Sequence, residues 1–146
     1  MVNLRPITSE NYLEAFRLSL APGQKRFVSD PVRSLAQAYV WRNQCQPFGI
    51  YAGETMVGYL LVIYDDEENT YNIWHLMVDQ SRQRKGYGRA ALRAAAEYIR
   101  TKPFGDSRTV LLTCSPENPA FSLYEELGYC PTGRVDGDEI ELALTL

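Results

Sequence analysis

The chain has 146 residues, of which 45% are hydrophobic and 23% charged, and its formal net charge is −3. These values fit a single soluble domain over residues 1–146 with one hydrophobic core. The acidic balance argues against non-specific binding to nucleic acid, which requires cations that neutralise phosphates. No stretch reaches the roughly 20 apolar residues of a membrane-spanning helix. We therefore expect no nucleic-acid partner and no membrane.

The first half of the chain predicts a strand, two helices and three further strands. In order, these are a strand over residues 2–7, helices over about 10–20 and 31–43, and strands over 48–52, 56–64 and 70–78. The clearest local signal is Asp30 before Pro31, because aspartate caps helices and proline favours their first position. Between the two helices, residues 24–29 are predicted to form a loop.

The second half predicts a glycine-containing loop, two helices and three strands. In order, these are a loop over 79–88, a helix that ends before Pro103, a strand over 109–114, a helix that ends at Gly128, and strands over about 130–135 and 139–146. Asp136-Gly137 joins the last two strands and is a strong hairpin dipeptide.

The predicted element order is therefore β-α-α-β-β-β-α-β-α-β-β. The central strand-helix-strand unit should form a right-handed crossover between parallel strands. The hairpin-like outer pieces predict antiparallel pairing. The expected fold class is α+β, with a mixed, twisted central sheet that carries helices on both faces.

The three cysteines, Cys45, Cys114 and Cys130, are far apart in the sequence, and no Cys-x-x-Cys pair occurs. Their odd number and wide spacing predict neither a disulfide framework nor a zinc site. The chain opens Met-Val-Asn-Leu-Arg-Pro, without the apolar region of a secretion signal. The sequence therefore predicts a reduced, cytoplasmic protein that binds no metal.

The loop before the alanine-rich helix has the features of an anion-binding site. It follows an apolar strand, contains Gly86 and Gly88, and runs directly into a helix whose first N–H groups have no partner within the helix. The cations that surround it are Arg82, Arg84, Lys85 and Arg89. Alternatively, the two glycines only allow the chain to turn, and the loop binds no ligand. Because the loop lacks both the GxxxxGK(S/T) pattern and a third glycine at dinucleotide spacing, the sequence indicates a diphosphate-like ligand bound in another way.

Two blocks of sequence carry a resemblance to a known family. Residues 76–79 and 83–92, Leu-Met-Val-Asp and Gln-Arg-Lys-Gly-Tyr-Gly-Arg-Ala-Ala-Leu, resemble the coenzyme A motif of the GNAT superfamily of N-acetyltransferases. That motif reads Q/R-x-x-G-x-G/A and follows an apolar strand. Residues 115–129 resemble a second block of the family, N-x-x-A-x-x-L-Y-x-x-x-G-F. The likeness extends over essentially the whole chain and implies the GNAT fold.

The resemblance implies that acetyl-CoA is the co-substrate. The backbone that would pair with the pantetheine arm, like an added strand, belongs to Leu76, Met77 and Val78. The N–H groups that would cradle the pyrophosphate belong to Gln83, Arg84, Lys85, Gly86, Tyr87, Gly88 and Arg89. Asn118 matches an asparagine that contacts the cofactor, although the commoner position of that residue holds Glu117 here. The alternative is that Asn118 caps a helix with Pro119 in the first position.

The second block supplies a candidate acid. Tyr124 matches the tyrosine that, in many family members, donates a proton to the departing coenzyme A thiolate. A positioned hydroxyl can do this because it stabilises the charge that develops on sulfur. The alternative is an aromatic side chain that packs beside Leu123 and Leu127.

The attacking amine must lose a proton, which requires a base or a chain of waters. His75 is the only histidine, lies on the strand that leads to the cofactor loop, and has an ordinary pKa near 6.5. Strand alternation predicts that His75 and Met77 share one face of the sheet. The opposite face should carry Trp74, Leu76 and Val78. Glu117 and Tyr124 are alternative bases, in which case His75 packs away from the site.

Within the superfamily, the chain is most similar to bacterial spermine/spermidine-type acetyltransferases, through residues 34–39, 47–51, 56–59 and 133–140. That likeness implies a small-molecule amine as the acceptor, with polyamines among the candidates. The four acids of residues 65–68 could bind ammonium groups or simply be solvated. The basic pair Lys25-Arg26, and His75 where relatives more often carry arginine, argue against a polyamine.

Two other functions remain open from the sequence. One is acetylation of a protein N-terminus or lysine, and the other is a coenzyme A-binding sensor without catalysis. The intact loop and Tyr124 argue against the sensor. Dimers are common in the family, so a homodimer is among the assemblies that the sequence allows.

Overall fold

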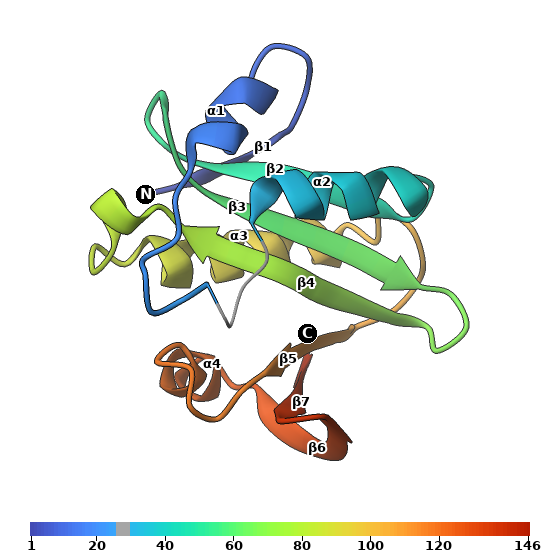
Figure 1. The fold of residues 1–146 in the computed structure, drawn as a ribbon. Coiled ribbons are helices and arrows are strands. Elements are labelled where there is room, and N and C mark those ends of the chain that lie inside the picture. Colours follow the sequence, from blue (N-terminus) through green and yellow to red (C-terminus); the bar gives the residue numbers. More distant parts are fainter. Residues whose placement is uncertain (26–29) are drawn as a thin grey trace.

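The computed structural model describes residues 1–25 and 30–146, so residues 26–29 of the predicted loop lie outside the described residues. The elements follow the predicted order, with one short 3-10 helix added (Figure 1). They are β1 (Asn3–Pro6), α1 (Tyr12–Arg17), α2 (Pro31–Val40), β2 (Cys45–Ala52), β3 (Thr55–Asp65), β4 (Thr70–Val78), η1 (Gln80–Arg82), α3 (Tyr87–Arg100), β5 (Thr109–Cys114), α4 (Phe121–Glu126), β6 (Cys130–Asp136) and β7 (Glu139–Thr145). No helix in the described ranges is long and apolar enough to cross a membrane.

The strands form one seven-stranded sheet in the order β1-β2-β3-β4-β5-β7-β6. Neighbouring strands are antiparallel except for β4 and β5, which are parallel and joined by the crossover helix α3. Helix α3 packs on one face of the sheet, and α1 and α2 lie on the other (Figure 1). The predicted α+β class, with a mixed sheet and helices on both faces, is confirmed.

The parallel strands β4 and β5 separate soon after they begin. Their register partners are Tyr71 with Val110 and Asn72 with Leu111, at the start of both strands. Beyond Asn72 the two strands diverge (Figure 1). Among the described strands, the rest of β4 therefore pairs with β3 alone, and its backbone groups on the β5 side are left for other partners.

A bulge in β4 redirects one side chain. Leu61 of β3 pairs with His75, and the next residue, Val62, pairs with Ile73, so Trp74 is an extra residue in β4. The ring of Trp74 stacks on that of His75, with centroids 5.3 Å apart and planes 7° apart. Alternation is broken at this point, and the prediction that Trp74 lies on the face opposite His75 is wrong.

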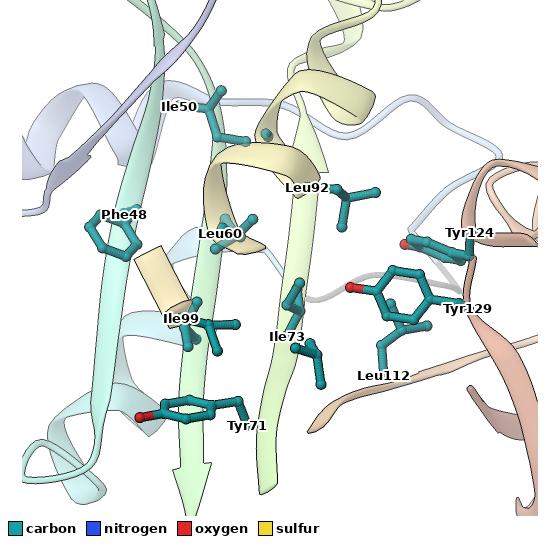
Figure 2. Packing of buried hydrophobic residues seen from close by; sticks show 14 of the residues in the cluster. Phe48, Ile50, Leu60, Tyr71, Ile73, Leu92, Ile99, Leu112, Tyr124 and Tyr129 are labelled. Carbon is teal, nitrogen blue, oxygen red and sulfur yellow. The ribbon is translucent and has the colours of Figure 1, made fainter. Parts of the chain in front are cut away.

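The main core lies between the sheet and α3, and a smaller one lies beneath α2. The main core includes Leu60, Ile73, Leu92, Ile99 and Leu112, with Tyr124 and Tyr129 at one end (Figure 2). The smaller core includes Tyr59, Leu61 and Met77. Because β3 and β4 contribute to both cores, they are fixed from both faces. At Gly58 a Cβ would stand 2.4 Å from the carbonyl oxygen of Met77, so a glycine is needed for this close pairing.

Candidate active site

A cavity of about 420 Å³ opens where β4 ends and α3 begins. The predicted cofactor-binding residues that line it are Leu76, Met77, Val78, Gln83, Arg84, Gly86, Tyr87, Gly88, Arg89 and Asn118. Lys85 is not among its lining residues. Lining residues that sequence reasoning did not assign to the site are Gln24, Arg82, Pro119, Ala120 and Leu123. Arg82 had a sequence signal in its charge beside the loop, and Pro119, Ala120 and Leu123 lie in the second block of the resemblance, whereas Gln24 was only part of a predicted loop.

The glycine loop turns its backbone toward this cavity. Arg84 and Gly86 have φ angles of 63° and 80°, in the left-handed region that glycine adopts most freely. Successive N–H groups in such conformations form a concavity that binds anions. Helix α3 then begins at Tyr87 with no side-chain cap and no acidic residue in its first turn. The positive end of the helix dipole is therefore available to a negatively charged group.

Side-chain contacts hold the loop against its neighbours. Gln83 Nε2 donates to Gln24 Oε1 at 2.7 Å and to the backbone oxygen of Val78 at 3.1 Å. Arg89 pairs with Glu126 of α4. Within the described part of the chain, the cavity-lining cations Arg82 and Arg84 have no ion pair, so their charge is available to an anion in the cavity.

A smaller cavity, of about 170 Å³, lies where β4 and β5 have separated. Leu76, Asn118 and Tyr124 line both cavities. The other walls of the smaller cavity are Ile73, Trp74, His75, Leu112, Thr113, Cys114 and Glu139. A long ligand that follows β4 from the larger cavity would therefore reach a space lined by both predicted catalytic residues.

Residues 11–129 match the acetyltransferase (GNAT) family. The chain belongs to this family. It is accordingly an acetyl-CoA-dependent N-acetyltransferase, and the phosphate-binding features of the larger cavity suit that co-substrate. No curated protein matches the sequence. In residues 1–25 and 30–146, no cluster of three or more His, Cys, Asp or Glu side chains could hold a metal ion.

Solved GNAT structures share the fold at low sequence identity. The spermidine N-acetyltransferase of Vibrio cholerae, in complex with CoA and spermine, is 18% identical, with a TM-score of 0.77 over 99% of this chain and 95% of that one. The PaiA N-acetyltransferase of Thermoplasma acidophilum, in complex with coenzyme A, is 16% identical, with a TM-score of 0.74 over 100% and 99%. An acetyltransferase of Bacillus subtilis, in complex with CoA, is 18% identical, with a TM-score of 0.71 over 99% and 97%.

Tyr124 of this GNAT protein keeps its proton at neutral pH. Burial, with smaller contributions from Cys114 and Tyr129, raises the pKa of Tyr124 above its ordinary value. The side chain is 9% exposed, and its ring meets that of Tyr129 edge-on with centroids 6.0 Å apart. Its hydroxyl has no hydrogen-bond partner among the residues that the structure describes. A neutral O–H donor therefore lies where both cavities meet, and its role as the acid stays a prediction.

Asn118 precedes α4 instead of capping it. Its Oδ1 accepts a hydrogen bond from the backbone nitrogen of Ala120 at 3.0 Å, whereas the N-cap position of α4 is Ala120 itself. The side chain therefore fixes the turn that leads into α4. Because Asn118 also lines both cavities, cofactor contact stays a prediction that this turn does not exclude.

His75 belongs to a buried hydrogen-bonded chain. Its Nδ1 lies 2.6 Å from Ser34 Oγ, and Ser34 Oγ lies 2.8 Å from the hydroxyl of Tyr59. Ser34 and Tyr59 are fully buried. Burial, and to a lesser degree the charge of Arg33, lowers the pKa of His75 to about 4. The imidazole is therefore neutral at pH 7, but it is a weaker base than its ordinary pKa implied.

We predict that the imidazole of His75 remains neutral down to about pH 4. In the unfolded chain its pKa returns to about 6.5, so protons bind the unfolded state first as the pH falls. The contribution of His75 to the free energy of unfolding is then fully present above pH 6.5 and declines by about 3 kcal/mol in total as the pH falls toward 4. NMR titration of the ring would measure the pKa, and His75→Gln should remove this part of the acid dependence. A midpoint near 6.5 in the folded protein would contradict the prediction.

Proposed function

We propose that this protein acetylates a primary amine of a small cationic molecule, with polyamines among the candidates. The amine attacks the thioester directly, while acetyl-CoA and the acceptor are bound together. The two adjoining cavities support this arrangement. The larger one has the cations and backbone N–H groups for a pyrophosphate, and Tyr124 lines both it and the smaller one.

A third cavity, of about 340 Å³, favours a cationic acceptor. Trp74 lines it as well as the smaller cavity beside Tyr124. Its walls include two exposed tryptophans and three acids, Trp41, Trp74, Asp65, Asp66 and Glu67. Carboxylates can replace water around an ammonium group, and indole faces attract cations. A molecule whose amine lies in the smaller cavity would find favourable contacts here for a second positive charge.

The chemistry follows from this placement. The pyrophosphate binds at the N-terminus of α3, and the pantetheine arm pairs with the free side of β4. The amine nitrogen attacks the carbonyl carbon, and the C–S bond breaks. Sulfur keeps the electron pair of that bond and accepts a proton from the Tyr124 hydroxyl. The nitrogen becomes acidic as the C–N bond forms, so His75, although a weak base, accepts the proton that it loses. Proton exchange with solvent then returns His75 to its neutral form and restores the hydroxyl of Tyr124.

A thiol-release assay with acetyl-CoA tests the proposal. The acceptors are spermine, spermidine, putrescine, n-butylamine, an aminoglycoside, free amino acids and a peptide with a free N-terminus and lysine. We expect the highest kcat/KM with small molecules that carry two or more positive charges. Asp66→Asn should raise the KM for spermidine and leave that for n-butylamine unchanged, since a monoamine has no second charge. Preference for the peptide would replace the small-molecule assignment, and tight coenzyme A binding without any turnover would indicate a sensor.

A further inference from the structure

Glu139 is the one carboxylate on the wall of the smaller cavity, counting the residues that the structure describes. It is the first residue of β7 and directly follows the turn that joins β6 to β7. The next residue, Ile140, pairs with Cys114, the last residue of β5. Glu139 therefore stands at the end of β5 where the space beside β4 is open, in the cavity that Tyr124 also lines.

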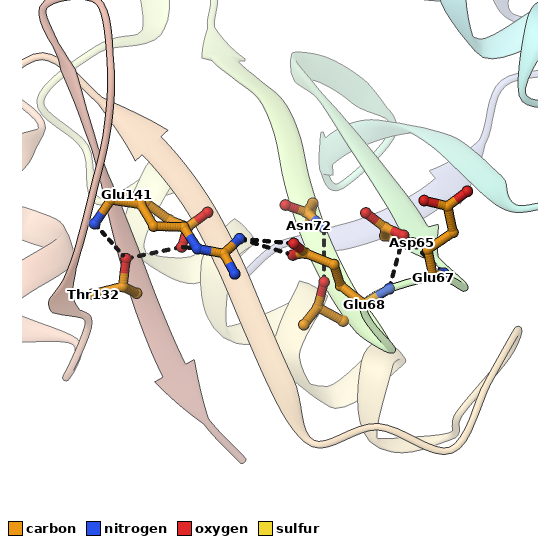
Figure 3. Close-up of polar contacts among 8 residues, drawn as sticks. Asp65, Glu67, Glu68, Asn72, Thr132 and Glu141 are labelled. Atoms are coloured by element: carbon orange, nitrogen blue, oxygen red, sulfur yellow. Dashed lines mark hydrogen bonds and ion pairs between the residues drawn. The ribbon is translucent and has the colours of Figure 1, made fainter.

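The carboxylate of Glu139 differs from that of its neighbour along the strand. Two residues on, Glu141 accepts a hydrogen bond from Thr132 Oγ1 at 2.8 Å and lies 3.9 Å from Arg134 Nε (Figure 3). Arg134 in turn pairs with Glu68, in the turn between β3 and β4. In the described part of the chain, the side-chain carboxylate of Glu139 has neither a hydrogen-bond donor nor a cation as partner.

An unpartnered carboxylate in this position is unfavourable without a ligand. Burial, together with the negative charges of Asp136 and Asp138, raises the pKa of Glu139. Because Glu139 is partly buried, the charged form therefore loses part of its hydration and gains no compensating contact from the described residues. A bound cation would supply that contact and stabilise the carboxylate.

Primary alkyl amines fit this requirement. Their pKa lies close to that of lysine, about 10.4, so near neutral pH they approach the protein as ammonium ions. On the basis of the function proposed above, we propose that Glu139 binds the ammonium form of the acceptor amine in the cavity beside Tyr124, before the ammonium releases one proton to bulk water and the neutral amine attacks. The carboxylate acts on binding, because its attraction for the nitrogen falls once the amine is neutral.

Glu139→Gln tests this assignment because it keeps the size of the side chain and removes its charge. We expect the KM for n-butylamine to rise about tenfold, with kcat and the KM for acetyl-CoA within about twofold of the wild type. Glu141→Gln is the matched control, since it makes the same change on the same strand outside the cavity. It should leave all three constants unchanged.

Direct binding separates this inference from the proposed function. Calorimetry with coenzyme A-saturated protein should show that n-butylamine binds about tenfold more weakly to Glu139→Gln than to the wild type, whereas uncharged n-butanol does not distinguish them. If the amine binds through Glu139 but no panel member is acetylated, the proposed function fails and the binding role stands. Equal affinities, no binding to the wild type, an equal loss in Glu141→Gln, or a lower kcat at unchanged KM would each overturn the role of Glu139.

Discussion

Replacing Gly86 by aspartate is expected to weaken acetyl-CoA binding by roughly a hundredfold or more, which corresponds to about 2.7 kcal/mol. Gly86 lies immediately before α3 and lines the larger cavity, where the pyrophosphate is proposed to bind. A new carboxylate there would repel the phosphates by about 4 kcal/mol at 4 Å, for an effective dielectric constant near 20. The fold should tolerate the change, because the nearest atom to a Cβ at Gly86 is 3.6 Å away and aspartate tolerates the left-handed region better than most residues.

Calorimetry with coenzyme A measures this effect, and two further variants separate its causes. Gly53→Asp places the same residue in the same left-handed conformation, φ 63°, in the open turn between β2 and β3, so it should bind coenzyme A normally. Gly86→Asn keeps the new side chain without its charge and should fall between the wild type and Gly86→Asp. Full affinity in Gly86→Asp would show that the phosphates bind elsewhere.

The sequence could predict which residues line the proposed cofactor cavity, because the signals for them are local. Asp30 and Pro31 start α2 as expected, with Asp30 Oδ1 accepting from the backbone nitrogen of Arg33 at 3.0 Å. The loop that contains Gly86 runs into a helix, and its residues are close together in sequence, so their positions follow from the order of the elements. Lys85 is the exception, since it does not line the cavity that its neighbours form.

The proposed acceptor half could not be predicted, because it depends on contacts between distant segments. No residue type in β4 signals the bulge at Trp74, which adds one residue to the strand. The bulge brings the ring of Trp74 onto the same face of the sheet as that of His75. The contact between Ser34 and His75 joins residues 41 positions apart, and the resulting burial lowers the pKa of the imidazole. In the sequence, Glu139 does not differ from the other residues of its strand. Only the separation of β4 and β5 in the fold places it on a cavity wall.

The separation of β4 and β5 gives the molecule both halves of the proposed site. It leaves hydrogen-bonding groups of β4 free for an extended ligand, and it creates the smaller cavity in which Tyr124, His75 and Glu139 face a common space. A sheet that paired fully across these strands would satisfy its own backbone and have no such space. The proposed function therefore depends on the part of the sheet in which β4 and β5 do not pair.

Tyr124→Phe is expected to lower kcat by more than about tenfold, or about 1.4 kcal/mol in the barrier, with coenzyme A affinity unchanged. The substitution removes only the hydroxyl that is proposed to protonate the departing thiolate. Stability should change little, because that hydroxyl has no hydrogen-bond partner in the described residues and the ring keeps its packing against Tyr129. Single-turnover rates, calorimetry with coenzyme A and thermal denaturation measure the turnover, the affinity and the stability.

Tyr129→Phe is the matched control for this experiment. Tyr129 is also buried, burial also raises its pKa, and its ring touches that of Tyr124, but it lines neither the cofactor cavity nor the cavity between β4 and β5. Its variant should therefore keep kcat within about twofold of the wild type. Unchanged turnover in Tyr124→Phe would exclude the acid role, and an equal loss in both variants would trace the effect to packing of the aromatic pair instead of proton donation. A loss confined to Tyr124→Phe leaves proton donation to the thiolate as the function of the buried hydroxyl.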